Sequence, residues 1–301
     1  MNGINASSLF HFTRDFETIK KIVENGLRYS YSLEYAPKEV VQAHLAPLCP
    51  EDVDSNEIDK RVSIPMISFC DIPLTRTMKH MSFYGSYVIG LNKKAIITKY
   101  DKTINPVIYT HSSNLTDFIK LLGAKYSRNE NNILKHIVME AKKYANLPPE
   151  CFEKDENIIR ANFKPFIEAN FLLSFILGLI KPVSRGNKCY YDEREWRLFY
   201  PYNAHKRFDW KWGISKKEFE LNKISWNNEL NSSKDFFIQI SEQDVDKYIT
   251  HIIVRKEDDV DKMIRFILEN DKLFGYDWKD KYSRYKLISK VMSMERIERD
   301  F

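Results

Sequence analysis

Glycine is scarce in this sequence, at 9 of 301 residues, which excludes collagen-like and other fibrous chains. The 4 cysteines are scattered and form no C-x-x-C pair, so neither a disulfide framework nor a zinc cage is expected. The N-terminus lacks the basic and apolar regions of a signal peptide. The longest apolar run, Phe171 to Ile180, is too short to span a bilayer. These absences predict a cytoplasmic protein in a reducing compartment, without a membrane segment.

Motifs for nucleotide cofactors and catalytic metals are missing as well. The sequence contains neither G-x-x-x-x-G-K-[ST] nor G-x-G-x-x-G, so a P-loop or Rossmann cofactor site is not supported. It also lacks H-E-x-x-H and a convincing D/E-x-K arrangement, which leaves a nuclease as a remote alternative. No metal site is therefore expected.

The residues that are present are typical of a folded protein. Aromatic residues make up 14% of the chain, which excludes intrinsic disorder. The net charge of +5 is small but leaves polyanionic partners open. That total hides an acidic stretch at 51–59 and a stretch at 181–220 in which basic and aromatic residues alternate. Such a stretch either contacts nucleic acid or forms an ordinary amphipathic surface around a core.

Hydrophobic patterning predicts an α+β protein. Short β-prone runs indicate strands, and apolar residues at helical spacing indicate helices. The expected strands are 8–12, 63–74, 86–91, 105–110, 190–200, 234–240 and 249–254, and the expected helices are 15–25, 133–141, 165–181 and 260–268. Residues 46–65 are expected to form an exposed loop, and the tail after Tyr276 is polar and basic.

The domain organisation follows from the absence of a linker rich in Gly, Ser or Pro. Residues 1–301 are predicted to form a single domain. Its strand-rich core comprises 1–111 and 186–270, and a helical insertion lies at about 112–185.

The densest chemical feature is the stretch from Glu193 to Arg197. On a strand, Glu193, Glu195 and Arg197 share one face. Neighbouring carboxylates repel unless they are paired or used, and the arginine can pair with one of them. Two interpretations remain open. One is a surface strand laced with salt bridges, and the other is a carboxylate pair that stabilises an oxocarbenium-like centre in glycosyl transfer.

Other candidate residues lie in the first third of the chain. His11 is either a packed side chain or a hydrogen-bond partner of a ligand hydroxyl, with Thr13 beside it at the strand-to-helix turn. Cys70 with His80 is a weak candidate nucleophile, because nothing local marks a thiolate site. Metal binding by His11, Asp71 and His80 is weaker still, because no tight histidine pair is present.

Three segments together resemble the AbiGi family of abortive phage-resistance proteins. They are SLFHFT near the start, PMISFCDIPLT with the later YGSYVIGLNK, and EREWR late in the chain. The same order of motifs is more distantly similar to ADP-ribosyltransferase-like folds. The resemblance implies an anti-phage protein with a mixed β core and an inserted helical region, and NAD as its substrate.

The transferase resemblance also implies roles for individual residues. His11, with Thr13 beside it, would hold a ribose of NAD, Ser68 would brace the middle of the site, and Tyr84 would stack on nicotinamide. Glu195 would bind the ribose 2′-hydroxyl and stabilise the transition state, while Glu193 would help the acceptor attack. The chain departs from the family pattern in having histidine on the first strand and no Thr-Ser after the middle serine.

Two functions are held side by side. The first is an NAD-dependent ADP-ribosyltransferase or NAD-cleaving effector with a nucleic-acid or protein acceptor. The second follows from the antitoxin-type role described for AbiGi. It is a non-catalytic antitoxin or regulatory subunit of the same fold that binds a toxin partner or nucleic acid.

Overall fold

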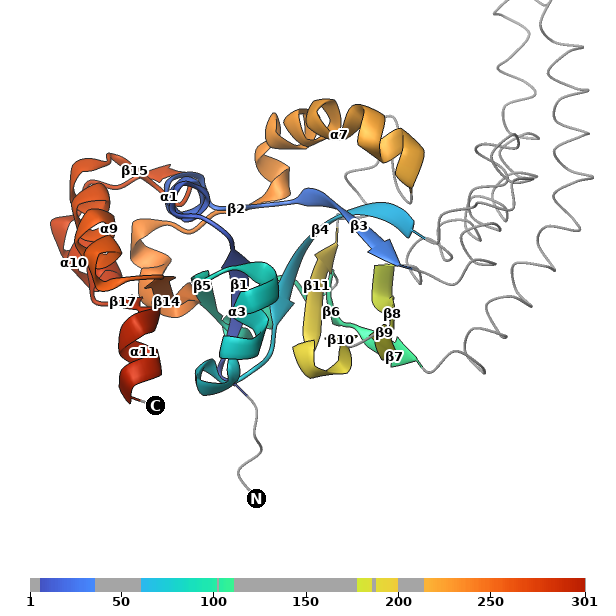
Figure 1. Cartoon of the computed structure of the whole chain (residues 1–301). Coiled ribbons are helices and arrows are strands. Elements are labelled where there is room, and N and C mark those ends of the chain that lie inside the picture. The colour runs from blue at the N-terminus through green and yellow to red at the C-terminus, as the bar shows by residue number, and fades with distance from the viewer. Residues whose placement is uncertain are drawn as a thin grey trace, which may run out of the picture.

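A computed structural model describes residues 6–35, 61–101, 103–110, 178–185, 188–199 and 214–300. Within these residues, one mixed sheet of 9 strands organises the fold, in the order β17-β14-β5-β1-β4-β11-β6, with β3 and β12 also paired to β4 (Figure 1). The pairing of β14 with β17 is parallel and the others are antiparallel. The strands are β1 (Ser8–Thr13), β3 (Ser30–Tyr35), β4 (Arg61–Cys70), β5 (Tyr87–Asn92), β6 (Ile104–Pro106), β11 (Glu195–Phe199), β12 (Ile214–Ser215), β14 (Ile249–Val254) and β17 (Val291–Ser293).

Short strand pairs extend this framework. They are β7 (Ile108–Thr110) with β8 (Ile180–Pro182), β9 (Ser184–Arg185) with β10 (Lys188–Cys189), β2 (Leu27–Arg28) with β13 (Phe237–Ile238), and β15 (Lys272–Leu273) with β16 (Tyr276–Asp277). The helices of the described residues are α1 (Phe16–Asn25), α3 (Met78–Tyr84), α4 (Lys93–Lys99), α7 (Lys216–Asn231), α8 (Val245–Tyr248), α9 (Glu257–Glu269), α10 (Lys281–Ile288) and α11 (Met294–Asp300). The sheet and these helices confirm the predicted α+β class.

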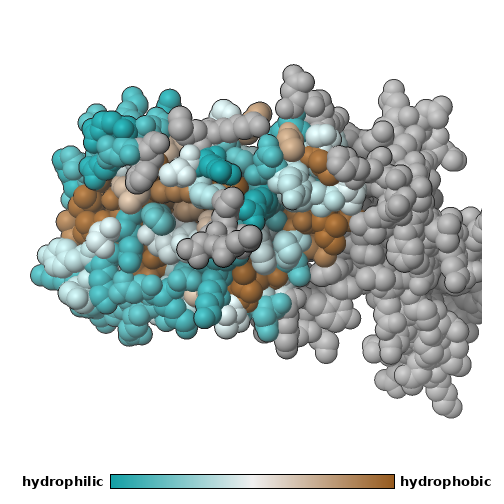
Figure 2. All heavy atoms as spheres, turned by 90° about the horizontal axis from the view of Figure 1, so that it is seen from below, coloured by the Kyte–Doolittle hydropathy of each residue, from teal (hydrophilic) through white to brown (hydrophobic). Residues whose placement is uncertain are grey.

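Local sequence signals mark both ends of helix α1. The side chain of Asp15 accepts a hydrogen bond from the backbone N–H of Thr18 at the start of α1. Gly26 ends that helix with φ at 90°, a conformation that favours glycine. Among the described residues, no helix is long and apolar enough to cross a membrane. The face seen in Figure 2 is largely hydrophilic, with hydrophobic areas between.

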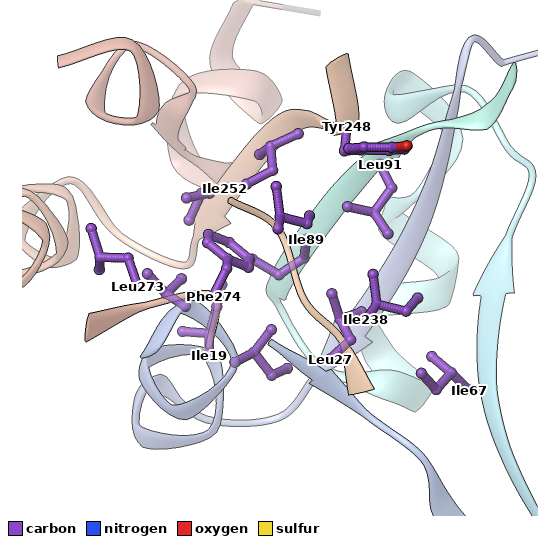
Figure 3. Close-up of a cluster of buried hydrophobic side chains, with 14 of the residues drawn as sticks. Ile19, Leu27, Ile67, Ile89, Leu91, Ile238, Tyr248, Ile252, Leu273 and Phe274 are labelled. Carbon is purple, nitrogen blue, oxygen red and sulfur yellow. The ribbon is translucent and has the colours of Figure 1, made fainter. Parts of the chain in front are cut away.

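The two faces of the sheet carry separate hydrophobic clusters. Side chains alternate along each strand, so Leu9 and Phe10 of β1 point to opposite faces. Leu9 belongs to the large core, which also takes in residues of α1, α9 and the chain around β13 (Figure 3). Phe10 packs with Val88 and Ile253 against Met294 and Ile297 of α11. The sheet is therefore buried on both faces near β1, β5 and β14.

Several predicted elements are confirmed with small changes of length. The strands expected at 8–12, 86–91 and 249–254 are β1, β5 and β14. The helices expected at 15–25 and 260–268 are α1 and α9.

Other predicted strands are interrupted. The run 190–200 is a 3-10 turn at Tyr191–Glu193 followed by β11, because Arg194 has φ at 45° and breaks the extension. The run 105–110 divides at Val107 into β6 and β7. The run 234–240 is a 3-10 turn followed by the two-residue strand β13. The run 63–74 stops at Cys70, before a turn that leads to α3.

The expected loop, one expected helix and the expected tail also need correction. The last residues of the loop 46–65 belong to β4, which starts at Arg61. The helix expected at 165–181 ends earlier, because Ile180–Pro182 is β8; its greater part, and the helix at 133–141, lie outside the described residues. The polar tail after Tyr276 is structured: it forms α10, β17 and α11, and β17 extends the main sheet.

Candidate functional site

The register of the central strands places the conspicuous Glu-x-Arg pair on one face of the sheet. Glu195 of β11 pairs with Cys70 of β4, which pairs in turn with Phe10 of β1. Arg197 pairs with Ser68. Residues that are paired directly across an antiparallel ladder project on the same side, and so do residues two apart on one strand. Glu195, Arg197 and Ser68 therefore share a face.

Glu193 reaches the same place by a different route from the one predicted. It lies at the end of the 3-10 turn rather than on the strand. The left-handed conformation of Arg194 turns the chain back, so the carboxylate of Glu193 lies beside that of Glu195. Both carboxylates contact the ammonium of Lys181 on β8, at 2.9 Å for Glu193 and 2.7 Å for Glu195.

Arg197 is the centre of this arrangement. Its side chain has no exposed surface. Its Nε donates to Glu195 Oε1 at 2.7 Å and its Nη2 donates to Glu34 of β3. Its Nη1 donates to the carbonyl oxygen of Gly178 at 2.6 Å. One guanidinium thus joins β11, β3 and the residues just before β8.

Two tyrosines and a second lysine complete the surroundings. The hydroxyl of Tyr84 donates to Glu193 Oε1 at 2.6 Å, and Lys188 donates to that hydroxyl at 2.7 Å. Lys188 also pairs with Glu193 at 2.9 Å. The backbone N–H of Glu195 donates to the hydroxyl of Tyr109 at 2.8 Å. We call this set the charge cluster; its charged members are Glu34, Lys181, Lys188, Glu193, Glu195 and Arg197.

The charge cluster is neutral and internally satisfied. Its three carboxylates face three cations. Burial alone would raise the pKa of Glu195, but Arg197 and Lys181 outweigh it and lower that pKa to about 2. Burial opposes the ammonium of Lys181, yet Glu195 and Glu34 raise its pKa. Glu195 and Lys181 are therefore both ionised at neutral pH.

Burial and the nearby carboxylates keep the neighbouring weak acids protonated. Burial raises the pKa of Tyr84, and the Glu193 carboxylate raises it further. Burial likewise raises the pKa of the Cys70 thiol, with a further contribution from Glu195. Cys70 is thus a neutral thiol at neutral pH, which does not suit the candidate nucleophile role.

His11 and Thr13 lie on the other face of the sheet. His11 follows Phe10, which shares its face with Cys70 and Glu195. The ring of His11 packs edge-on against Phe69, and its Nδ1 donates to the carbonyl oxygen of Ser68 at 2.9 Å. Burial lowers the pKa of His11, so the imidazole is neutral. Thr13 is buried two residues further on.

The structure thus joins some of the predicted site residues and separates others. Glu193, Glu195 and Tyr84 are in direct hydrogen-bond contact through the charge cluster. Ser68 shares the face of Glu195, whereas His11, which contacts the backbone carbonyl of Ser68, lies on the opposite face. In the described ranges, no three His, Cys, Asp or Glu side chains gather to hold a metal, and Asp71 is paired with Lys93.

Sequence reasoning missed four members of this site, namely Glu34, Tyr109, Lys181 and Lys188. They are distant from the EREWR stretch along the chain or lie on very short strands, so periodicity could not connect them. One signal was available. Lys181 follows directly on the apolar run that ends at Ile180, and a lone cation in such a position needs a buried partner.

The fold and site together define an α+β protein whose chemically conspicuous residues form a closed, neutral salt-bridge cluster. The family model described as "Putative abortive phage resistance protein AbiGi, antitoxin" matches residues 42–252. The chain belongs to this AbiGi family, as its motifs predicted. No curated protein and no solved structure matches the chain. The likeness to ADP-ribosyltransferase folds therefore stays a prediction.

Proposed function

We propose that this chain is the antitoxin component of an abortive-infection system and acts by binding a partner toxin, without catalysis. The observation that carries the proposal is the closed state of the charge cluster. Both oxygens of Glu195 are occupied, Oε1 by Arg197 and Oε2 by Lys181. The family description, which ends in the word antitoxin, supports the same role.

An NAD-dependent ADP-ribosyltransferase is the competing function. One observation favours the transferase function. Tyr84 contacts Glu193, and Glu193 and Glu195 contact the same ammonium of Lys181, so three predicted site residues lie close together. In the transferase mechanism, Glu195 would accept a hydrogen bond from a ribose hydroxyl of NAD. Only 5% of Glu195 is exposed, and that contact would have to displace Arg197 or Lys181. The position of His11 on the opposite face also speaks against this function.

The test combines neutralisation with NAD turnover. Genes that neighbour this one in its source genome are expressed singly, and the gene that arrests growth is then expressed together with this chain. We expect growth to recover and the two proteins to purify as a complex. The purified chain, alone and in the complex, is incubated with NAD labelled in nicotinamide, and we expect no release above the buffer level.

A matched variant separates the two functions. Tyr84→Phe removes the hydroxyl that contacts Glu193 but keeps the ring. Under the antitoxin proposal this variant, once shown to be folded by its thermal transition, neutralises growth arrest like the parent protein. Nicotinamide release by the parent that the folded variant loses would instead establish the NAD-dependent function.

A further inference from the structure

A cleft of about 640 Å³ lies apart from the charge cluster and shares no residue with it. Its walls come from the C-terminal ends of α1 and α7, from β2 and β13, and from the β15–β16 hairpin, which lies beside α1 (Figure 1). Sites for small ligands occupy roughly 300–1,000 Å³. The cleft is therefore large enough for a small organic molecule, and its lining determines which class.

Three cations and one carboxylate line the cleft. The cations are Arg28, Lys234 and Lys272, and the carboxylate is Asp277. In the part of the chain that the structure describes, none of these cations pairs with a carboxylate, and the ammonium of Lys272 donates to the amide oxygen of Asn25 at 3.1 Å. Three cations beside one carboxylate leave this lining with a net positive charge, although Asp277 stands opposite Lys272 across the hairpin, and a bound anion would offset the remaining repulsion.

Arg28 is held in a conformation suited to an oxyanion. It pairs with Phe237 across β2 and β13, and its guanidinium carbon lies 5.3 Å from the centre of the phenyl ring. A guanidinium that stacks on an aromatic ring keeps its N–H groups free at its edge. Those groups form the planar fork that binds phosphate oxygens in pairs.

The opposite wall of the cleft is the β15–β16 hairpin together with Gln239. Backbone hydrogen bonds fix the hairpin, and Gln239 supplies a side-chain amide. The N–H of Phe274 donates to Val23 at 2.6 Å and that of Gly275 donates to Glu24 at 2.9 Å, which anchors the hairpin to α1. Gly275 has φ at 88°, and a Cβ there would lie 2.5 Å from the amide nitrogen of Gln239. Glycine therefore lets the Gln239 side chain lie close to the hairpin, beside the exposed ring of Tyr276.

We propose that this cleft binds a nucleoside phosphate. Arg28, Lys234 and Lys272 contact the phosphate oxygens. The amides of Asn231 and Gln239 offer a donor and an acceptor each, which suits the edge of a base. An inorganic anion would leave these amides unused, and the Asp and Glu side chains of an acidic peptide carry no ring to lie against the tyrosine. The proposal is independent of the antitoxin function, because the cleft and the charge cluster have no residue in common.

Calorimetry on the full chain tests the proposal with five probes: adenosine monophosphate, guanosine monophosphate, ATP, inorganic phosphate and a single-stranded oligonucleotide. We expect one nucleotide to bind per chain, more tightly than inorganic phosphate and less tightly as salt rises. The double variant Lys234→Ala/Lys272→Ala should weaken nucleotide binding by at least about tenfold, because two charge-assisted contacts are lost. Lys94→Ala, an exposed lysine of α4, is the matched control and should bind like the parent.

The other outcomes overturn the proposal. Equal affinity for inorganic phosphate and nucleotide contradicts the base contacts. Binding of the oligonucleotide alone points to a polynucleotide surface. Binding that survives the double variant, or is lost equally in Lys94→Ala, places the site elsewhere. Both replaced lysines are exposed, so an unchanged thermal transition in the double variant separates lost binding from lost folding.

Discussion

A guanidinium without exposed surface must give its N–H groups to protein acceptors, and Arg197 finds them on three segments of the chain. The ion pairs offset the cost of burying its charge, but a hydrophobic side chain in its place would leave Glu34 and Glu195 without their partner. The charge cluster therefore behaves as a unit. Loss of one member costs more than the interaction of any single pair.

Replacement of Arg197 by methionine, which is unbranched and uncharged, tests this dependence. We expect the free energy of unfolding to fall by about 3–5 kcal/mol, because Glu34 and Glu195 each lose the Arg197 guanidinium and Glu195 keeps Lys181 alone. Urea denaturation of the purified variant measures the loss. Arg265→Met on the exposed side of α9 is the control and should change stability by less than about 0.5 kcal/mol. A loss of similar size in both variants would contradict the central role of Arg197.

Acid should weaken the charge cluster through Glu195. The pKa of Glu195 in the folded protein, about 2, lies below its ordinary value of 4.5. A depressed pKa contributes stability that is present above the unfolded value and is lost as pH falls towards the folded value. We therefore expect the free energy of unfolding to fall between about pH 4.5 and pH 2.

A comparison with Glu195→Gln isolates that contribution. The variant is less stable at neutral pH, and the difference between the two proteins should shrink as pH falls through this window. Urea denaturation at a series of pH values measures both curves. A constant difference across the window would show that Glu195 titrates in the folded state as it does in the unfolded chain.

How far the sequence predicts this site depends on distance along the chain. Alternation on a strand correctly places Glu195 and Arg197 on one face and allows their pairing, which the structure has. The same reasoning brings Glu193 to the right place for the wrong reason, because a turn rather than a strand positions it. Lys181 comes from β8, and no local pattern links β8 to β11. Contacts of that kind depend on topology.

At the scale of elements, α7 shows why periodicity can hide a helix. Its buried residues Phe219, Trp226 and Leu230 lie along one side, yet Leu221 and Ile224 are about four-fifths exposed. Apolar residues on two sides weaken the 3.6-residue pattern from which an amphipathic helix is predicted. Periodicity therefore does not predict α7, although it predicts α1 and α9, whose buried apolar residues lie on one side.

Substitutions on the two sides of α7 should differ in effect. Trp226 packs with Phe219 against Tyr31 and Leu33 of β3, so Trp226→Ala should lower the free energy of unfolding by about 3–5 kcal/mol. The double change Leu221→Ser/Ile224→Ser should alter it by less than about 1 kcal/mol, because both side chains are exposed. Thermal unfolding followed by circular dichroism compares them. The reverse order of effects would mean that the solvent-facing side of α7 is misassigned.

At the scale of the whole molecule, the C-terminal segment completes the sheet at one edge, although its composition predicts only a polar tail. β17 adds a strand parallel to β14, and the N–H of Ile252 donates to the carbonyl of Lys290 at 2.8 Å. The helix α11 then covers the face that carries Phe10 and Val88. The family match ends at residue 252, before this segment begins. The few apolar residues of this segment are enough to cover that face, because Met294 and Ile297 of α11 pack directly against the sheet.

A shortened chain tests whether this closure is required. Removal of residues 290–301 takes away β17 and α11 and exposes Phe10, Val88 and Ile253. Exposed apolar area of this kind favours association, and β14 would also become an open edge. We expect the shortened chain to elute as aggregate in size-exclusion chromatography and to lose its cooperative thermal transition. A chain that ends at Ile297 keeps both buried residues of α11 and should elute and melt like the parent. If the chain lacking 290–301 stays monomeric with an unchanged transition, the sheet without β17 and α11 is self-sufficient, and the C-terminal segment has no part in its stability.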